Sequence, residues 1–193
     1  VLTPHYFTRA MTDEALIRYY NAVADRSGIP VIIYHAPVFS SGVTVSVNMV
    51  SSLSGHLNIA GMKNTSNEDV LPYLKAVPEG ADFNILSGYI DKFYESLKSG
   101  ASGGILAVAN YLPDICCDLY DLCRSGDNVS GPKLNDRVCA LSRKASGNYG
   151  VAGVKAAMNL LGYFGGEPRN PLLPLGAGEV ETLRGYFEEE GIL

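Results

Sequence analysis

Lys63 and Tyr34 are the two side chains of this sequence whose positions favour chemistry. Lys63 follows the apolar run Leu57–Met62 and precedes the polar triplet Asn64–Ser66, and Tyr34 closes the apolar run Val31–Ile33. In a sheet of parallel strands, reactive side chains lie where strands end and loops begin. A lysine amine that is partly removed from water loses its proton more easily and can attack a carbonyl, and a nearby tyrosine can exchange protons with the substrate. Together these residues predict imine chemistry on a carbonyl substrate.

Each residue also has a simpler structural explanation. A lysine at a strand end commonly extends its amine to water, and an isolated tyrosine more often packs in a core with its hydroxyl hydrogen-bonded. The occurrence of Lys63 and Tyr34 at two successive strand ends favours the catalytic explanation.

Other chemically active residues give weaker signals. His5, His35 and His56 are far apart in the sequence and have no carboxylate at metal-ligand spacing, so we expect no metal site. The acidic triplet Glu188–Glu190 is expected to be a solvated helix face. The sequence has neither a G-x-S-x-G nucleophile elbow nor a phosphate-binding P-loop, and we expect no cofactor.

The elements that must hold Lys63 and Tyr34 are successive strand–helix units, because short apolar runs alternate with longer amphipathic stretches. The predicted strands are Ile29–Tyr34, Leu57–Lys63, Phe83–Gly88 and Gly104–Ala109. The predicted helices are Asp13–Asp25, Ser46–Leu53, Glu68–Val77 and Tyr89–Ser99, and the first three follow Thr12, Thr44, and Ser66 or Asn67. Nearly continuous apolar strands are typical of parallel sheets covered by helices.

A barrel is favoured over an open sheet, because no G-x-G-x-x-G motif follows any predicted strand. The remainder of the chain is predicted to be helical, with helices at Leu112–Arg124, Leu134–Lys144, Val151–Leu161 and Glu179–Glu189. Ser125–Lys133 is expected to be a loop, and Gly162–Pro174 an extended, ordered connection. We therefore expect residues 1–110 to be the C-terminal portion of a (β/α)8 barrel and residues 111–193 to be its closing helix and a helical extension.

Composition restricts the partners that the protein can have. The 193 residues carry a net charge of -5 without any basic cluster, so we expect neither nucleic acid nor a membrane as partner. A small-molecule substrate fits better. The four cysteines have the spacing of neither a zinc site nor a disulfide scaffold, and we expect them to be reduced thiols in a soluble intracellular protein. The chain starts Val1-Leu2-Thr3-Pro4 without an initiator Met, so we expect upstream sequence, including any targeting segment, to be missing.

Several segments resemble the dihydrodipicolinate synthase / N-acetylneuraminate lyase family in their order and spacing. They are Thr3-Pro4-His5-Tyr6, Ile33-Tyr34-His35-Ala36-Pro37, Asn58-Ile59-Ala60-Gly61-Met62-Lys63, Leu86-Ser87-Gly88, Gly104–Asn110 and Gly162–Leu172. The similarity extends over essentially the whole chain. It implies a (β/α)8 TIM barrel of which strands 4 to 8 are present here, followed by a C-terminal helical tail.

The resemblance also implies roles for individual residues. Lys63 resembles the lysine that forms the Schiff base, and Tyr34 the tyrosine that transfers protons and contacts the substrate carboxylate. Tyr6 resembles an interface tyrosine that reaches into the neighbouring subunit's site, which implies a homodimer or homotetramer. The resemblance places Thr65, Gly88, Ile105 and His35 among the substrate-binding positions.

The sequence departs from the family's pattern in two places. The Gly-Thr-Thr-Gly-Glu or Gly-Ser-Thr-Gly-Glu loop, which binds the pyruvate carboxylate in the family, has no counterpart here. We therefore expect the first strands to come from missing sequence or from a partner chain. In the synthases an arginine follows the Tyr-Asn-x-Pro segment, whereas this chain has Val38–Gly42 without a cation and His35 in place of the asparagine. Without that guanidinium the bidentate contact to a second carboxylate is lost, which disfavours aspartate semialdehyde as the partner of pyruvate.

The closest resemblance is to 4-hydroxy-2-oxoglutarate aldolases and 2-keto-3-deoxy-sugar-acid aldolases. It implies a lyase that cleaves a 4-hydroxy-2-oxo acid to pyruvate and an aldehyde, without a cofactor. The alternatives are dihydrodipicolinate synthase or N-acetylneuraminate lyase activity on the same scaffold and, in a different class, a non-catalytic barrel homologue. We expect a cytoplasmic location, and a mitochondrial one is the alternative.

Overall fold

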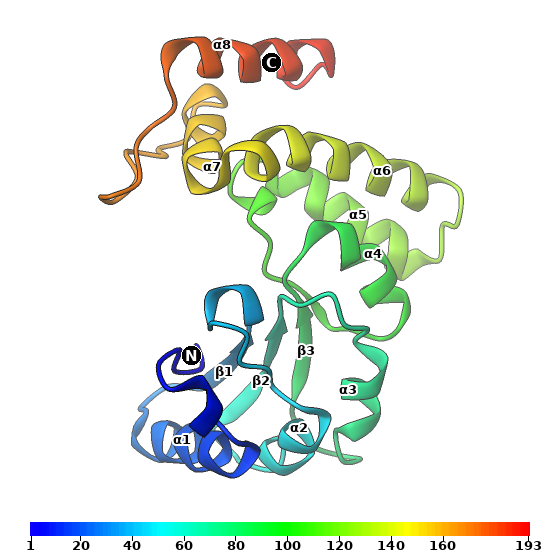
Figure 1. Cartoon of the computed structure of the whole chain (residues 1–193). Coiled ribbons are helices and arrows are strands. Elements are labelled where there is room, and N and C mark those ends of the chain that lie inside the picture. Colours follow the sequence, from blue (N-terminus) through cyan, green and yellow to red (C-terminus); the bar gives the residue numbers. More distant parts are fainter. The chain divides into compact units, whose positions relative to one another are not determined.

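The computed structural model of the protein describes all residues, Val1–Leu193. The chain divides into two compact units, Val1–Ile105 and Leu106–Leu193. The first unit contains a parallel sheet with helices, and the second unit is helical (Figure 1).

The sheet of the first unit has four parallel strands in the order β1-β2-β3-β4. Their bounds are β1 (Val31–His35), β2 (Ile59–Asn64), β3 (Asn84–Ser87) and β4 (Gly103–Gly104). Leu2 extends the sheet beyond β1 through an isolated parallel bridge with Tyr34. The first three predicted strands are therefore confirmed, with somewhat different ends.

The fourth predicted strand, Gly104–Ala109, is wrong over most of its length. Only Gly103 and Gly104 pair with β3, and the chain then turns into a 3-10 helix, η3 (Val108–Asn110). The amides of Ala109 and Asn110 donate to the carbonyls of residues three positions earlier in the chain. These local hydrogen bonds close helical turns, so this apolar segment forms a 3-10 helix and not a strand.

Four helices accompany the strands of this unit: α1 (Asp13–Arg26), α2 (Val47–Leu53), α3 (Leu71–Ala76) and α4 (Ile90–Lys98). Thr12 caps α1 as predicted, because its hydroxyl accepts the amide of Ala15. The cap of α2 is Ser46, and not Thr44, since the Ser46 hydroxyl accepts the amide of Met49.

Helix α3 begins three residues later than the predicted Glu68. Pro72 occupies the first turn of α3, where the missing amide hydrogen removes no helical bond. In a helix starting at Glu68, Pro72 would stand in the interior and would remove such a bond. The helix therefore starts next to the proline, at Leu71.

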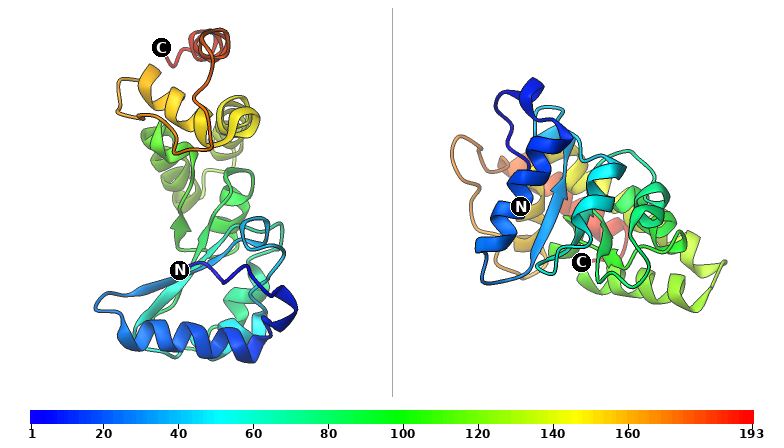
Figure 2. Two further views of the ribbon diagram at one scale, coloured as in Figure 1. Left: turned by 60° about the vertical axis from the view of Figure 1, so that its left-hand side comes forward. Right: turned by 90° about the horizontal axis from the view of Figure 1, so that it is seen from below.

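The core of the first unit lies between the sheet and helices α1, α2 and α3, which gather on one side of the strands (Figure 2). Along β1, buried and half-buried residues alternate, so Ile33 and His35 face the helices while Tyr34 faces the other side. Packing against the helices thus determines which strand-end side chains remain available for chemistry.

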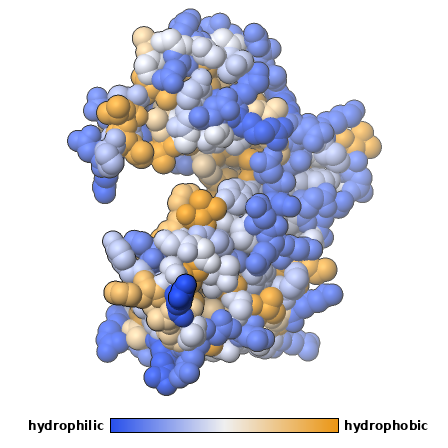
Figure 3. Space-filling view, viewed as in Figure 1, coloured by the Kyte–Doolittle hydropathy of each residue, from blue (hydrophilic) through white to orange (hydrophobic).

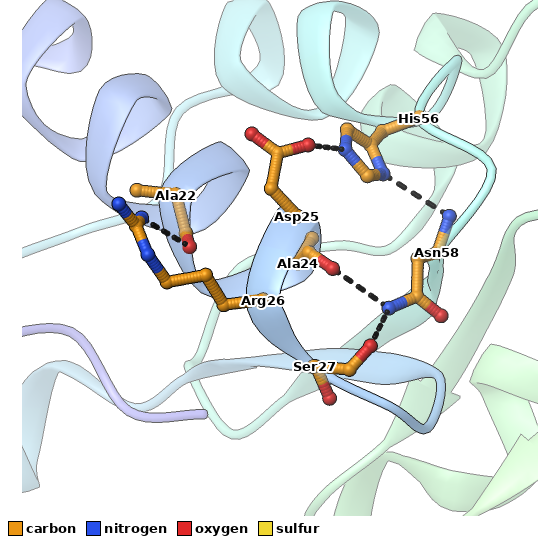
Figure 4. Close-up of polar contacts among 7 residues, drawn as sticks. All are labelled: Ala22, Ala24, Asp25, Arg26, Ser27, His56 and Asn58. Carbon is orange, nitrogen blue, oxygen red and sulfur yellow. Dashed lines mark hydrogen bonds and ion pairs between the residues drawn. The ribbon is translucent and has the colours of Figure 1, made fainter.

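A polar network fixes the amino-terminal edge of the sheet (Figure 4). The imidazole of His56 accepts the amide of Asn58 at Nδ1, and its Nε2 lies 3.1 Å from a carboxylate oxygen of Asp25. The side-chain amide of Asn58 donates to the carbonyls of Ala24 and Ser27 at 2.8 and 2.9 Å. The end of α1 and the turn before β2 are therefore held together.

The second unit consists of η3 and four helices, α5 (Pro113–Ser125), α6 (Ser130–Ser142), α7 (Asn148–Leu160) and α8 (Ala177–Glu189), with a π-helical turn, η4 (Arg143–Gly147), between α6 and α7. The predicted loop Ser125–Lys133 is shorter than expected. Asp127 accepts the amides of Val129 and Ser130, which starts α6 early, and Pro132 is tolerated in its first turn.

The end of the chain is attached to the earlier helices of its unit. The guanidinium of Arg137 donates to the carbonyl of Glu190, and the amine of Lys144 lies 3.7 Å from the ring centroid of Tyr186. Phe187 is fully buried and stacks with Tyr111. No helix of either unit is both long enough and apolar enough to cross a membrane.

Candidate active site

Lys63 and Tyr34 lie side by side near the carboxyl ends of neighbouring strands. The two residues are directly paired in the β1–β2 register, and the amine of Lys63 is 4.6 Å from the centroid of the Tyr34 ring. Parallel strands bring their carboxyl ends to one edge of the sheet. The two strand ends singled out from the sequence therefore form one site.

The Lys63 amine is half-buried and forms neither a hydrogen bond nor an ion pair within the chain. Burial lowers the pKa of Lys63 below its ordinary value, and no carboxylate opposes this shift. A larger fraction of the amine is consequently unprotonated, which is the form that attacks a carbonyl. This environment differs from that of a lysine whose amine is fully in water.

The Tyr34 hydroxyl is not engaged in a hydrogen bond with any other group of the chain, although the ring is half-buried. The ring is held instead by Lys63 and by Phe39, whose centroid is 6.4 Å away at an interplanar angle of 30°. A fixed ring with an unused hydroxyl can give a proton to a bound molecule and take one from it.

Phe39 belongs to a short, tightly bonded loop after β1 that includes the 3-10 turn η2 (Pro37–Phe39). The buried hydroxyl of Ser40 shares its one hydrogen between the carbonyls of Ala36 and Val43, at 3.0 and 2.8 Å. These bonds hold Phe39 against Tyr34 while leaving it 59% exposed. Sequence reasoning missed this contact, and the only available signal was an aromatic residue just after a strand end.

The loops that follow the strands are joined by backbone hydrogen bonds that continue the sheet. The amide of Thr65 donates to the carbonyl of His35 at 2.7 Å, and the amide of Gly88 to that of Asn64 at 2.7 Å. The amide of Ile105 continues this pattern to the carbonyl of Ser87 at 2.9 Å. Three of the residues expected to bind substrate, Thr65, Gly88 and Ile105, thus lie along the same edge as Lys63.

Gly88 leaves room for Thr65 in this edge. A Cβ atom on Gly88 would lie 1.9 Å from the hydroxyl oxygen of Thr65 and 2.9 Å from the carbonyl oxygen of Asn64. Thr65 is buried, and its hydroxyl has no hydrogen-bond partner in the chain. The glycine is therefore needed for the close packing of the loops after β2 and β3.

His35 lies on the opposite face of the sheet from Tyr34, fully buried beneath the helices. Its ring packs edge-on against Tyr73 of α3, and neither ring nitrogen has a hydrogen-bond partner. Burial lowers the pKa of His35, while the Glu68 carboxylate and the nearby Asn64 side chain oppose this shift less strongly. This position favours a structural role for His35.

A buried polar group lies beside His35. The hydroxyl of Tyr73 is within 3.0 Å of the carbonyl of Val45 and is also hydrogen-bonded to the carboxylate of Glu68. Burial and the Glu68 carboxylate raise the pKa of Tyr73 well above its ordinary value. Glu68 and Tyr73 therefore anchor the loop that follows Lys63, a role that the sequence did not indicate.

Tyr6 is not part of the pair formed by Lys63 and Tyr34. Its side chain is 71% exposed and makes a ring contact only with His5, at 4.4 Å between centroids. Phe7 beside it is 86% exposed. The two residues thus present aromatic surface to the outside of the unit.

No three His, Cys, Asp or Glu side chains are grouped so that they could hold a metal ion. Cys116 and Cys139 are buried, Cys117 is exposed, and none of the four cysteines forms a disulfide. At the carboxyl edge of the sheet, the Lys63 amine and the Tyr34 hydroxyl remain without a hydrogen-bond partner in the chain.

The parallel sheet with its helices and strand-end loops is part of a (β/α)8 barrel. Residues 1–189 match the Dihydrodipicolinate synthetase family, and the chain belongs to this family.

Curated relatives carry different names at similar identity. The chain is 32% identical to the probable mitochondrial 4-hydroxy-2-oxoglutarate aldolase of Emericella nidulans, over 98% of this chain and 61% of that protein. It is 33% identical to the L-threo-3-deoxy-hexylosonate aldolase of Hypocrea jecorina, over 100% of this chain and 62% of the relative. A 4-hydroxy-tetrahydrodipicolinate synthase of Nitrobacter hamburgensis is 32% identical, over 100% and 64%. The chain thus spans less than two thirds of these relatives.

Solved structures agree with this fold. A monomeric dihydrodipicolinate synthase variant is 27% identical, with a TM-score of 0.88 over 100% of this chain and 65% of that chain. KD(P)GA from T. tenax is 25% identical, with a TM-score of 0.85 over 100% of this chain and 66% of that chain.

Proposed function

We propose that this protein is a lysine-dependent lyase that reversibly cleaves a 4-hydroxy-2-oxo acid to pyruvate and an aldehyde. The observation that carries the proposal is the pairing of the half-buried Lys63 amine with the ring of Tyr34 at one edge of the sheet. Family membership supports aldolase or lyase chemistry in general.

The proposed reaction starts with attack of the neutral Lys63 amine on the C2 ketone of the substrate. Loss of water gives a protonated imine, which accepts the electron pair of the C3–C4 bond as that bond breaks. Tyr34, which has given its own proton to the carbinolamine hydroxyl that leaves as water, takes the proton of the C4 hydroxyl, so that the aldehyde leaves and an enamine remains. Protonation of the enamine at C3 and hydrolysis of the imine then release pyruvate and restore Lys63.

The proposed substrate is a 2-keto-3-deoxy sugar acid or 4-hydroxy-2-oxoglutarate. Phe39 packs on Tyr34, and the loop from Val38 to Gly42 has no cationic side chain. A guanidinium that could pair with the carboxylate of aspartate semialdehyde is therefore missing from this loop, and the same absence favours the sugar acid over 4-hydroxy-2-oxoglutarate, which also carries a second carboxylate. Two relatives named as aldolases support the same choice, although synthases are equally similar in sequence.

Borohydride trapping tests the imine. The protein is incubated with pyruvate and sodium borohydride, digested, and searched by mass spectrometry for a reduced lysine adduct. We expect the adduct on Lys63 and its loss in Lys63→Ala. Lys98 is the internal control, because its amine also lies over a tyrosine ring, that of Tyr94, but is more open to water and near Glu95.

Two alternatives would give different results in this experiment and in a product assay. A dihydrodipicolinate synthase or N-acetylneuraminate lyase would form the same adduct on Lys63 but would turn over aspartate semialdehyde or acylneuraminate in preference to 4-hydroxy-2-oxo acids. A folded protein that forms no adduct with pyruvate would support the non-catalytic barrel homologue and would overturn the proposal.

We further infer that the active form is a homodimer or homotetramer. The exposed aromatic side chains of Tyr6 and Phe7 supply apolar surface of the kind that subunit interfaces cover.

A further inference from the structure

The helical unit contains a cavity of about 560 Å³ that is separate from the residues around Lys63. Its lining residues come from α7, from the connection that leads to α8, and from α8 itself. Figure 1 shows the course of these segments. This volume is within the range of small-molecule sites. The residues that line it are Ala152, Lys155, Ala156, Asn159, Leu160, Phe164, Gly166, Glu167, Pro168, Pro174, Leu175, Val180 and Arg184.

The wall formed by the connection is fixed in place on α7. The amine of Lys155 donates to the carbonyl of Gly165 at 2.6 Å, and the amide of Gly165 donates to the side-chain oxygen of Asn159 at 2.8 Å. A Cβ atom on Gly165 would lie 2.1 Å from the Lys155 carbonyl oxygen, so only glycine permits this close approach. The cavity is therefore preformed, which reduces the entropy lost when a ligand binds.

The two half-buried charged residues that line the cavity are both cations. Lys155 is half-buried and has no carboxylate as ion-pair partner. Arg184 is also half-buried, and its only ion pair is a long contact of 3.6 Å with the largely exposed Glu181. Glu167 lines the cavity but is exposed to water. Two cations in a partly dehydrated environment without a buried counter-ion attract an anion.

The remainder of the lining is mostly apolar. Ala152 and Ala156 of α7 line the cavity together with Leu175 and Val180. The aromatic ring of Phe164 is 90% exposed at the same cavity, although it belongs to an anchored segment. Hydrophobic side chains gather on the surface of the helical unit where this connection runs (Figure 3). An inorganic anion would leave this apolar surface uncovered.

We propose that this cavity is a binding site for a small organic carboxylate with an apolar or aromatic body. The carboxylate pairs with Arg184 and with the remaining donors of Lys155, and the body covers the alanines of α7 and the ring of Phe164. None of these residues belongs to the unit that carries Lys63, so the site is distinct from the proposed reaction.

The probe for this site is phenylacetate, titrated into the whole protein and followed by isothermal calorimetry and by ligand-observed NMR. Uncharged 2-phenylethanol has the same ring but no carboxylate, and inorganic phosphate has the charge but no ring. We expect saturable binding of phenylacetate that is at least about tenfold tighter than that of either control compound.

Two variants test the location. Arg184→Gln removes one cation and should weaken phenylacetate binding about tenfold, whereas Arg18→Gln makes the same change on the exposed face of α1 and should have no effect. Ala156→Leu should weaken binding by filling the cavity. Circular dichroism and the melting temperature establish that each variant is folded.

Three results would overturn the proposal: equal affinity for phenylacetate and 2-phenylethanol, binding that Arg184→Gln leaves unchanged in a folded protein, or phosphate binding as tightly as phenylacetate. Failure of borohydride trapping at Lys63 would not affect this conclusion, because the two sites share no residue.

Discussion

At the scale of single residues, the proton-transfer role that we propose for the Tyr34 hydroxyl can be tested directly. Replacing Tyr34 with phenylalanine keeps the ring between Lys63 and Phe39 but removes the hydroxyl that we propose exchanges protons with the substrate. We expect kcat for aldol cleavage to fall by about 10²- to 10⁴-fold, because proton transfer by a positioned side chain contributes to catalysis on this scale.

Steady-state kinetics and borohydride trapping of the Tyr34→Phe variant distinguish chemistry from damage to the fold. Imine formation with pyruvate should persist at a lower rate, and the melting temperature should change little. The role assigned to Tyr34 would be refuted by a folded Tyr34→Phe variant with wild-type kcat.

His35 predicts a pH dependence of stability. Its pKa is lowered in the folded protein by burial, whereas in the unfolded chain it is near the usual value of about 6.5. As the pH falls below that value, the unfolded chain takes up a proton before the folded protein does. The free energy of unfolding therefore decreases as the pH falls from about 6.5 towards the folded-state pKa.

Urea denaturation at several pH values between 7.5 and 5 measures this effect. In His35→Asn the decrease in the free energy of unfolding with falling pH should be smaller than in the wild type. His5→Asn, at an exposed position, is the control and should follow the wild type. If wild-type and His35→Asn curves run parallel, His35 does not contribute to acid sensitivity.

At the scale of elements, the loops after β2 and β3 depend on the absence of a side chain at Gly88. Gly88→Ala would introduce a Cβ atom in conflict with Thr65 and with the Asn64 carbonyl. We expect the free energy of unfolding to fall by about 1–3 kcal/mol, the usual effect of overpacking. Gly55→Ala, which meets no atom within 4 Å, is the matched control.

A double-mutant cycle assigns this loss to a specific contact. In a Thr65→Ala background the hydroxyl that meets the new Cβ atom is absent, so Gly88→Ala should destabilise the protein less. Additive effects of the two substitutions would show that the conflict lies elsewhere, for example with the Asn64 carbonyl.

Much of the element pattern could be predicted from the sequence because burial leaves a strong periodic signal. The runs ending in Tyr34 and Lys63 indicated two neighbouring parallel strands, and the register places these two residues directly side by side. Local hydrogen bonding decides the remaining boundaries. Pro72 sets the start of α3 and Asp127 that of α6, and neither follows from apolar periodicity.

The direction in which each side chain points was the feature of the site that was hardest to predict from the sequence. His35 follows Tyr34 directly, and strand alternation turns its ring to the helices, away from Lys63. The contact between Phe39 and Tyr34 depends on the hydrogen bonds of Ser40, which act over a few residues and have no motif.

At the scale of the whole molecule, the aromatic surface of Tyr6 and Phe7 predicts self-association. We expect Tyr6→Ser combined with Phe7→Ser to shift the protein to a smaller assembly, because two exposed rings no longer become buried between subunits. Sedimentation velocity measures the change. Leu57→Ser, at another fully exposed apolar position, should leave the assembly intact. A monomeric wild type would contradict the expected homodimer or homotetramer.

The two edges of the sheet are stabilised by different residues. At the amino edge, Asp25, His56 and Asn58 join α1 to β2 through side-chain hydrogen bonds (Figure 4). At the carboxyl edge, the strand-end loops are joined through backbone groups, which every residue type except proline can supply. The side chains of Lys63 and Tyr34 therefore make none of the hydrogen bonds that hold this edge, whereas those of Ser40, Asn64 and Glu68 do.

The loop after β1 shows what this division of roles allows over evolutionary time. Its shape depends on Ser40 and on main-chain bonds, whereas Val38 and Phe39, which are 76% and 59% exposed, contribute little burial to it. In the proposed aldol reaction, exchanges at these two positions would alter which aldehyde is accepted while the scaffold and Lys63 persist. New substrate preferences can thus arise by successive substitutions at these positions, because the intermediate sequences keep the fold.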